Sequence, residues 1–290
     1  NKKLRKERKS TMVTGIVDVG GGLRGIYAAG ILDTCMAHCI KFDCCIGVSA
    51  GSANMAAYLA GQQGRNYRYY QEYSFRKAYM GVGNLLHTGS YINLDYVYGT
   101  LSNTGGESPL DYDALVRNPA KLLVVATRAD TGEARYFTKE DLHRDDYQIL
   151  MASSCVPGVN RPYMLKRVPY FDGALSDPVP IEKAFAEGCD RVVLILTKPA
   201  AIPRRQGKDR VLADLIEQSY PIAARQLRLR AERYNRAVQL ARQYEKEGRM
   251  YILSPADISG VDTLKRNRPA LQRLYQMGLQ DGRTLLNWLE

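Results

Sequence analysis

Hydrophobic and polar positions alternate along the chain between short apolar runs of strand length and longer stretches with helical periodicity. The run 12–19 predicts a buried strand, and the stretch 26–40 predicts a helix because leucine, isoleucine and alanine recur at helical spacing. A second strand over 44–47 leads into a helix of small residues over 49–60. The N-terminal part therefore follows the strand–helix order of an α/β protein.

The same order resumes after residue 120, where a strand over 121–127 is followed by a short antiparallel partner over 135–138. The remaining predicted elements are a helix over 145–153, strands over 168–171 and 191–197, a helix over 180–187, helices over 207–247 interrupted at Pro221, a strand over 250–253 and a helix over 264–288. This alternation predicts a three-layer α/β/α sandwich with a mostly parallel central sheet. We expect residues 12–290 to form one domain, with 201–290 as its mainly helical C-terminal part.

The segment 62–118 differs, because tyrosine is frequent there and is interleaved with arginine and glycine. It predicts helices and loops that cover one face of the sheet. Most of these rings are expected to pack around the core, and a grip on a lipid interface is the alternative.

Composition excludes several classes of protein. Of the 290 residues, 45% are hydrophobic, which excludes a disordered chain, and the longest apolar runs are strand-sized, so no membrane span is predicted.

The net charge is +11, and the excess lies in two regions. Residues 1–10 hold six basic residues and one acidic residue, and residues 204–248 hold eleven basic and six acidic residues. These basic termini predict an anionic partner, for which we prefer a membrane surface to nucleic acid because no nucleic-acid module is recognised. An ordinary soluble surface is the alternative.

Cysteine usage indicates a reducing compartment. Four of the six cysteines lie between residues 35 and 45, in or beside apolar stretches, which is unlike a secreted disulfide framework. No second ligand pair completes a metal site, so we expect buried free thiols and no metal. Residues 1–11 predict a disordered basic leader and no secretory signal. We therefore expect a cytoplasmic protein, peripheral at a membrane if the basic termini bind one.

Residues 47–51, Gly-Val-Ser-Ala-Gly, match G-x-S-x-G between a predicted strand and a predicted helix. A serine on such a tight turn has an exposed hydroxyl, and only small neighbours allow the turn to close. Ser49 would also lie at a helix N-terminus, where free amides favour negative charge. Ser49 is therefore a candidate nucleophile, and a structural cap in a tight turn is the alternative.

Residues 20–25, Gly-Gly-Gly-Leu-Arg-Gly, fit the dinucleotide-binding pattern G-x-G-x-x-G as well as an oxyanion hole. The dinucleotide pattern requires an acid at the end of the next strand, whereas Asp43 precedes that strand. We therefore favour an oxyanion hole, in which unobstructed backbone amides meet a developing alkoxide. Arg24 either adds positive charge there or supports the loop.

A Ser-His-Asp triad of the α/β-hydrolase type is disfavoured, because the three histidines are His38, His87 and His143 and none follows residue 143. Asp172 is the candidate base instead, since it ends a predicted strand and precedes Gly-Ala. Shielding from solvent would raise its pKa and ease proton transfer. A solvated aspartate in a strand-exit turn is the alternative.

These three motifs, in this order and on these elements, resemble the patatin-like phospholipase family over roughly residues 12–200. Two further stretches, 152–158 and 177–180, are also similar to that family. The resemblance implies a Ser-Asp dyad with Ser49 as nucleophile and Asp172 as base, and with Gly20, Gly21 and Gly22 offering oxyanion amides. It implies no cofactor.

The expected function is that of a serine acyl hydrolase, of phospholipase, lysophospholipase or esterase type, which acts on lipid esters through an acyl-enzyme. Two alternatives stay open, an acyltransferase that uses the same site and a catalytically silent lipid-binding protein.

Overall fold

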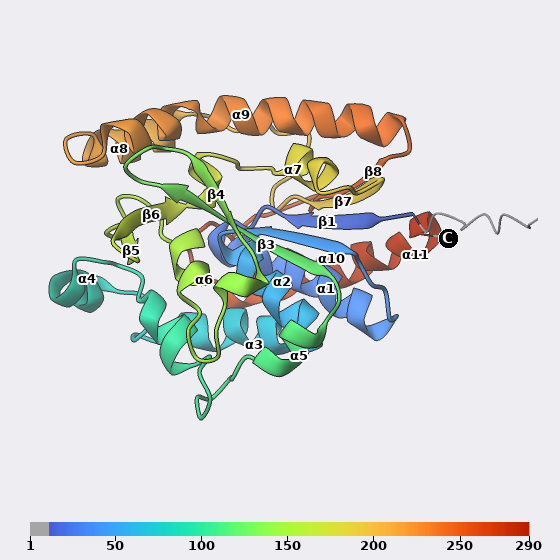
Figure 1. Ribbon diagram of the computed structural model, residues 1–290, viewed down its shortest axis with the longest axis horizontal. Helices are drawn as coiled ribbons and strands as arrows, with labels where there is room; N and C mark the ends of the chain where they lie inside the picture. Colours follow the sequence, from blue (N-terminus) through green and yellow to red (C-terminus); the bar gives the residue numbers. More distant parts are fainter. Residues whose placement is uncertain (1–11, 290) are drawn as a thin grey trace, which may run out of the picture.

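The computed structural model describes residues 12–289, so the leader predicted over 1–11 lies outside the described residues (Figure 1). Its centre is one eight-stranded sheet. Its strands, from one edge to the other, are β5 (Tyr163–Leu165), β6 (Val168–Asp172), β3 (Lys121–Arg128), β2 (Cys44–Val48), β1 (Thr14–Asp18), β7 (Arg191–Ile195) and β8 (Met250–Leu253), with β4 (Ala134–Phe137) paired to β3.

Most of the sheet is parallel. The strands β3, β2, β1, β7 and β8 run in one direction, while β4, β5 and β6 are antiparallel to their neighbours. All five residues of β1 are buried, as expected for a parallel strand covered on both faces.

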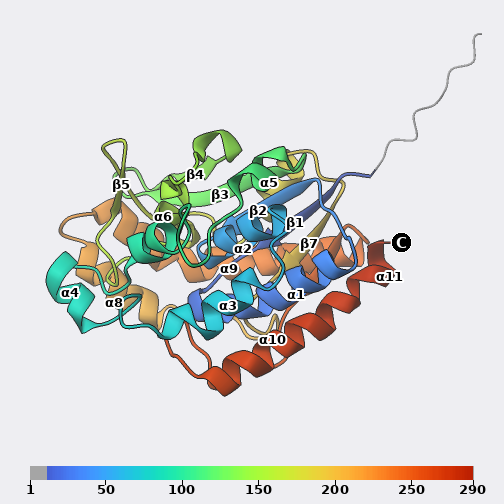
Figure 2. The same ribbon diagram turned by 90° about the horizontal axis from the view of Figure 1, so that it is seen from below.

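Helices cover both faces of the sheet (Figures 1 and 2). One face carries α1 (Ile26–Ala37), α2 (Ala50–Leu59), α3 (Arg65–Gln71), α6 (Gln148–Ser153) and α10 (Arg268–Arg283). The other carries α7 (Ile181–Ala186) and α9 (Pro221–Lys246), with α8 (Gly207–Ile216) packed on α9. The smaller helices α4 (Val82–Thr88), α5 (Tyr112–Arg117) and α11 (Leu285–Leu289) lie at the periphery.

Alternation along β1 divides the core into two parts. Ile16 joins the cluster under α1 and α10, whereas its neighbour Val17 joins the cluster under α9, which includes Val238. The predicted α/β class, three layers and mostly parallel sheet are therefore confirmed.

The structure differs from the predictions in one helix and adds one strand. The helix predicted over 264–288 begins at Arg268, where the Asn267 side chain accepts the Ala270 amide and caps it, and it breaks at Thr284 before α11. Strand β5 was not predicted. It forms a hairpin with β6 through Lys166 and Arg167, both at positive φ.

Candidate active site

Ser49 lies on the turn between β2 and α2, with φ of 57°. A non-glycine residue at positive φ is strained, so the surrounding structure must hold it. The flanking glycines allow the turn to close: a Cβ at Gly47 would overlap the backbone of Ser52, and one at Gly51 would overlap the carbonyl oxygen of Asp18. The close packing of this turn explains why the motif requires glycine at both positions.

A neighbouring helix fixes the turn. The Ser49 amide donates to the Ser153 hydroxyl oxygen of α6 over 2.9 Å, and that hydroxyl donates to the Val125 carbonyl over 2.6 Å. The hydroxyls of Ser52 and Ser153 are also 2.8 Å apart. Ser153 thus links the strained turn to strand β3, and it is a positioning residue that the sequence analysis did not single out.

Strand register brings Asp172 beside this turn. Val48 pairs with Val125 across β2 and β3, and the next residue of β3, Ala126, pairs with Asp172 of antiparallel β6. Ser49 and Asp172 therefore flank β3 at the same level, although they are far apart in the sequence. Both side chains line one cavity.

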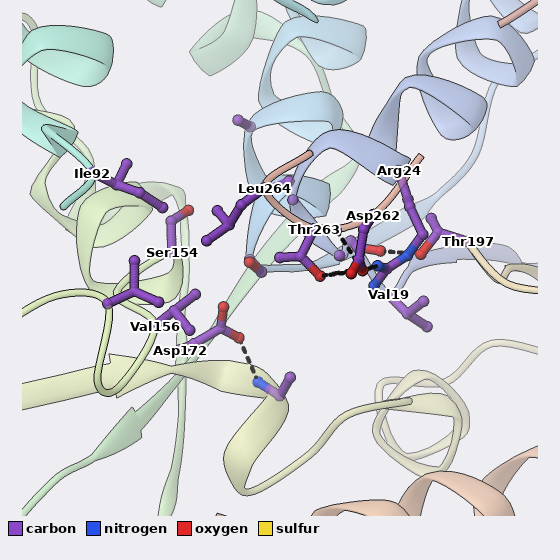
Figure 3. Close-up of a pocket in the computed structure, with 18 of the residues that line it drawn as sticks. Val19, Arg24, Ile92, Ser154, Val156, Asp172, Thr197, Asp262, Thr263 and Leu264 are labelled. Carbon is purple, nitrogen blue, oxygen red and sulfur yellow. Dashed lines mark hydrogen bonds and ion pairs between the residues drawn. The ribbon is translucent and has the colours of Figure 1, made fainter. Parts of the chain in front are cut away.

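Asp172 is 4% exposed, and desolvation raises the pKa of its carboxyl group. Interactions with the Ser49 side chain and the Ala174 amide, together with the charges of Arg230 and Arg204, act in the opposite direction. The Ala174 amide donates to Asp172 Oδ1 over 2.9 Å, which leaves Oδ2 for another partner (Figure 3). A shielded carboxylate with a raised pKa is a stronger base than one in water.

The glycine loop follows β1 and faces the serine turn. Gly20, Gly21 and Gly22 all have positive φ, at 63°, 120° and 61°. A Cβ at Gly20 would overlap the carbonyl oxygen of Val48, and one at Gly22 would overlap that of Thr263. These positions therefore require glycine for conformation and for space.

Asp18, the last residue of β1, holds this loop and is fully buried. Its Oδ1 accepts the Gly20 amide over 2.9 Å, and its Oδ2 accepts the Asn54 amide group over 2.9 Å. Desolvation raises the pKa of Asp18 to about 6, against the effect of these two hydrogen bonds. The Gly20 amide is therefore engaged by Asp18. In the described part of the chain, the amides of Gly21 and Gly22 have no such acceptor.

Arg24 lies beside the loop, and its guanidinium is held by the C-terminal part of the chain (Figure 3). Nη1 donates to Asp262 Oδ1 and to Thr263 Oγ1, each over 2.9 Å. The residue is 5% exposed, and burial lowers the pKa of the guanidinium while Asp262 opposes that effect. The Leu23 amide also donates to the Thr263 carbonyl over 3.0 Å. Arg24 thus joins the glycine loop to the segment after β8.

The cavity that these elements enclose has a volume of about 940 Å³ and two kinds of wall. One wall is mostly apolar and aromatic, lined by residues that include Tyr73, Tyr79, Ile92, Val97, Leu101 and Val156. The other wall, which includes Arg24 of the glycine loop, is cationic and also carries Lys198, Arg204 and Lys208. Figure 3 shows Ile92 and Val156 on the side of Asp172, and Arg24 and Asp262 on the other.

Lys198 lies on the cationic wall of the cavity. Desolvation and the positive charges of Arg24 and Arg204 lower its pKa to about 8. Because the neighbouring positive charges disfavour the protonated form of Lys198, an anion bound at this wall would be electrostatically stabilised. Among residues 12–289, no three histidine, cysteine or acidic side chains lie close enough together to hold a metal ion.

The structure brings together all the residues singled out from the sequence: Ser49, Asp172, Gly20, Gly21, Gly22 and Arg24 line one cavity. It adds Asp18, Asn54 and Ser153, which hold these residues in position. Asp18 could have been recognised from the sequence, because an aspartate inside an apolar strand must have a buried hydrogen-bond partner.

Two family models match different parts of the chain. The model of the patatin-like phospholipase family matches residues 19–185, and that of a domain of unknown function (DUF6363) matches residues 220–290. The uncharacterized protein YjjU of Escherichia coli (strain K12) is 31% identical over 192 residues, which are 64% of this chain; the match spans 52% of that relative, about half its length. The crystal structure of VipD from Legionella pneumophila covers 95% of this chain and 67% of its own, with a TM-score of 0.47 and 12% identity.

Proposed function

The chain belongs to the patatin-like phospholipase family, and we propose from this premise that it hydrolyses lipid acyl esters with Ser49 as nucleophile and Asp172 as general base. The observation that carries the proposal is the position of these two side chains. They flank β3 in one cavity, and the carboxyl has a raised pKa in a shielded site. A nucleophile next to an activated base is what acyl transfer through serine requires.

In the first step, the Asp172 carboxylate accepts the Ser49 hydroxyl proton while Oγ attacks the ester carbonyl carbon. The amides of Gly21 and Gly22 donate to the oxyanion that forms. The amide of Gly20 already donates to Asp18, so its contribution is to shape the loop. The carbon–oxygen bond of the ester then breaks, and the leaving alcohol takes the proton from Asp172.

In the second step, Asp172 accepts a proton from water, and the resulting hydroxide attacks the acyl-enzyme. The proton returns to Ser49 Oγ as the fatty acid leaves, which restores the dyad. This chemistry needs no redox partner and no third catalytic side chain.

The two walls of the cavity suggest how a substrate would lie. The apolar and aromatic wall fits an acyl chain, and the cationic wall beside the glycine loop fits an acidic group on the alcohol portion. A lipid with an apolar chain and an anionic part would contact both walls while its ester lies at Ser49.

The test is the hydrolysis of p-nitrophenyl esters of increasing acyl length by the wild type and by Ser49→Ala and Asp172→Asn. We expect both variants to lose at least about a thousandfold in kcat, with the midpoint of thermal unfolding unchanged. The wild-type rate should rise with pH through the raised pKa of Asp172, because the base must be ionised. Ser219→Ala and Asp214→Asn, two exposed positions, are the matched controls. Activity retained in Ser49→Ala would contradict the proposal.

A further inference from the structure

Exposed apolar side chains gather at one end of the molecule. Of the ten large hydrophobic residues that are exposed in the described chain, seven lie on three neighbouring segments. They are Val82, Leu85 and Leu86 of α4, Met164 of β5, and Ile202, Val211 and Leu215 on or just before α8. Figures 1 and 2 both place α4, β5 and α8 at the same end of the sheet. Such clustering differs from the scattered exposed residues that most surfaces carry.

Helix α4 is the clearest member of this group. None of its seven residues is buried, and the Leu86 side chain is 79% exposed. A helix this short is unstable alone, and it is held through its ends: the Gly81 amide donates to the Tyr91 carbonyl, and the Tyr91 amide donates to the Val159 carbonyl. Its apolar side chains therefore face outward without a partner in the described chain.

The same segments surround the cavity. Val159 and Ile202 line it, and so does Val211 of α8. Leu212 and Leu215 of α8 lie against Gly158, which connects α8 to the loop that carries Val159. Two of the seven exposed apolar side chains, those of Ile202 and Val211, thus line the cavity directly.

Charge on these segments is strongly positive. Residues 77–92, 156–168 and 199–216 together contain eight lysine and arginine residues and only two acidic residues, both aspartates. The basic residues include Arg161, Lys166 and Arg167, which are exposed next to Met164. We call the surface formed by these three segments the rim surface.

We propose that the rim surface docks on the headgroup region of an anionic lipid bilayer, with the apolar side chains of α4, β5 and α8 inserted and the basic side chains on the lipid phosphates. Interfacial binding combines these two contributions. Among residues 12–289, no helix is long and apolar enough to traverse a bilayer, so this contact is peripheral. It overlaps the basic termini expected from the sequence only through residues 204–216, because β5 and α4 belong to neither terminus. The proposal rests on the proposed function only in explaining why residues of these segments also line the cavity.

The test measures co-sedimentation with vesicles in the Ser49→Ala background, so that the result does not depend on catalysis. Vesicles of phosphatidylglycerol and phosphatidylcholine in equal parts are compared with pure phosphatidylcholine. We expect preferential binding to the anionic vesicles that weakens with salt. V82S/L85S/L86S and, separately, K166E/R167E should each weaken it at least about tenfold.

Two control variants match these changes elsewhere on the molecule. M12S/V116S removes exposed apolar side chains away from the rim surface, and K41E/K246E reverses two exposed charges in other loops and helices. Both should bind as the parent does. Equal binding by the rim variants, or no binding to anionic vesicles, would overturn the proposal, as would binding that is lost only when the basic residues of 1–10 are neutralised. Esterase assays on a soluble short ester, made with Ser49 intact, report separately on the proposed function, since V82S/L85S/L86S should then retain the parent activity.

Discussion

The two parts of the chain contribute differently to the site. The residues proposed for the reaction lie between Gly20 and Asp172, within the segment that matches the family. The part over 201–289 supplies cover and support: α9 packs on one face of the sheet, α10 packs on α1, and Asp262 holds Arg24. Part of the structure that supports the reactive residues therefore comes from a separate region of the sequence.

The contact between α1 and α10 shows how closely the C-terminal part packs against the N-terminal part. A Cβ at Gly30 of α1 would overlap the Tyr275 carbonyl oxygen of α10, and one at Gly278 would overlap the Tyr27 carbonyl oxygen of α1. The two backbones are separated by no side chain at these positions. The C-terminal part is thus fitted to the N-terminal part and is not a loosely attached addition.

The largest effect is expected from removing the C-terminal part. A chain that ends at residue 200 loses β8, α9 and α10, which exposes apolar residues on both faces of the sheet. We expect no cooperative thermal unfolding and little near-ultraviolet circular dichroism. A cooperative transition in this fragment would show that the two parts fold independently.

Gly278→Ala tests the contact between α1 and α10 alone. The added methyl group must displace a backbone atom, so we expect a loss of about 1–3 kcal/mol in the free energy of unfolding. The rate of ester hydrolysis per folded molecule should be unchanged, because the site around Ser49 and Asp172 is not altered. Gly207→Ala is the control, since a Cβ there meets no atom within 4 Å. Equal unfolding midpoints for the two variants would disprove the close fit.

Asp18→Asn tests support from within the N-terminal part. The pKa of Asp18 is about 6 in the folded protein against 3.8 for the unfolded chain. A raised carboxyl pKa gives stability that is present below pH 3.8 and is lost as the pH rises through 6, which corresponds to about 3 kcal/mol. Urea unfolding between pH 4 and pH 7, at ~1 unit intervals, should show this decline in the wild type and less of it in the variant. Parallel pH profiles would refute the assignment.

The smallest effect is expected from Asp262→Asn. Asp262 is half exposed, so its ion pair with Arg24 is worth little, and we expect kcat/KM to fall by no more than about fivefold. Asp257→Asn, exposed in the same loop, is the control. A fall of several hundredfold would mean that the C-terminal part contributes directly to the reaction.

Sequence alone was sufficient where the signal was local. The alternation of apolar runs predicted the strand order along the chain, and the glycine spacing around Ser49 predicted a turn that the structure contains. Strand β5 was missed because three residues are too few to give a periodic signal.

Support from distant residues could not be predicted in the same way. Nothing near Arg24 in the sequence indicates that Asp262 and Thr263 would hold it, because that contact depends on where the chain returns after β8. Ser153 is similar, since its bond to the Ser49 amide depends on how α6 packs against the turn. Pairings between residues more than a hundred positions apart follow from the assembled sheet, not from local pattern.

The glycine loop also sets limits for protein engineering. Mutagenesis libraries across residues 20–22 should consist almost entirely of inactive clones, since all three positions disfavour a side chain by backbone angle and Gly20 and Gly22 also exclude one by space. The aromatic wall carries no such restriction, because Tyr73, Tyr79 and Val97 contribute side chains to the cavity. Altered substrate range should therefore be sought in that wall, while the loop is kept constant.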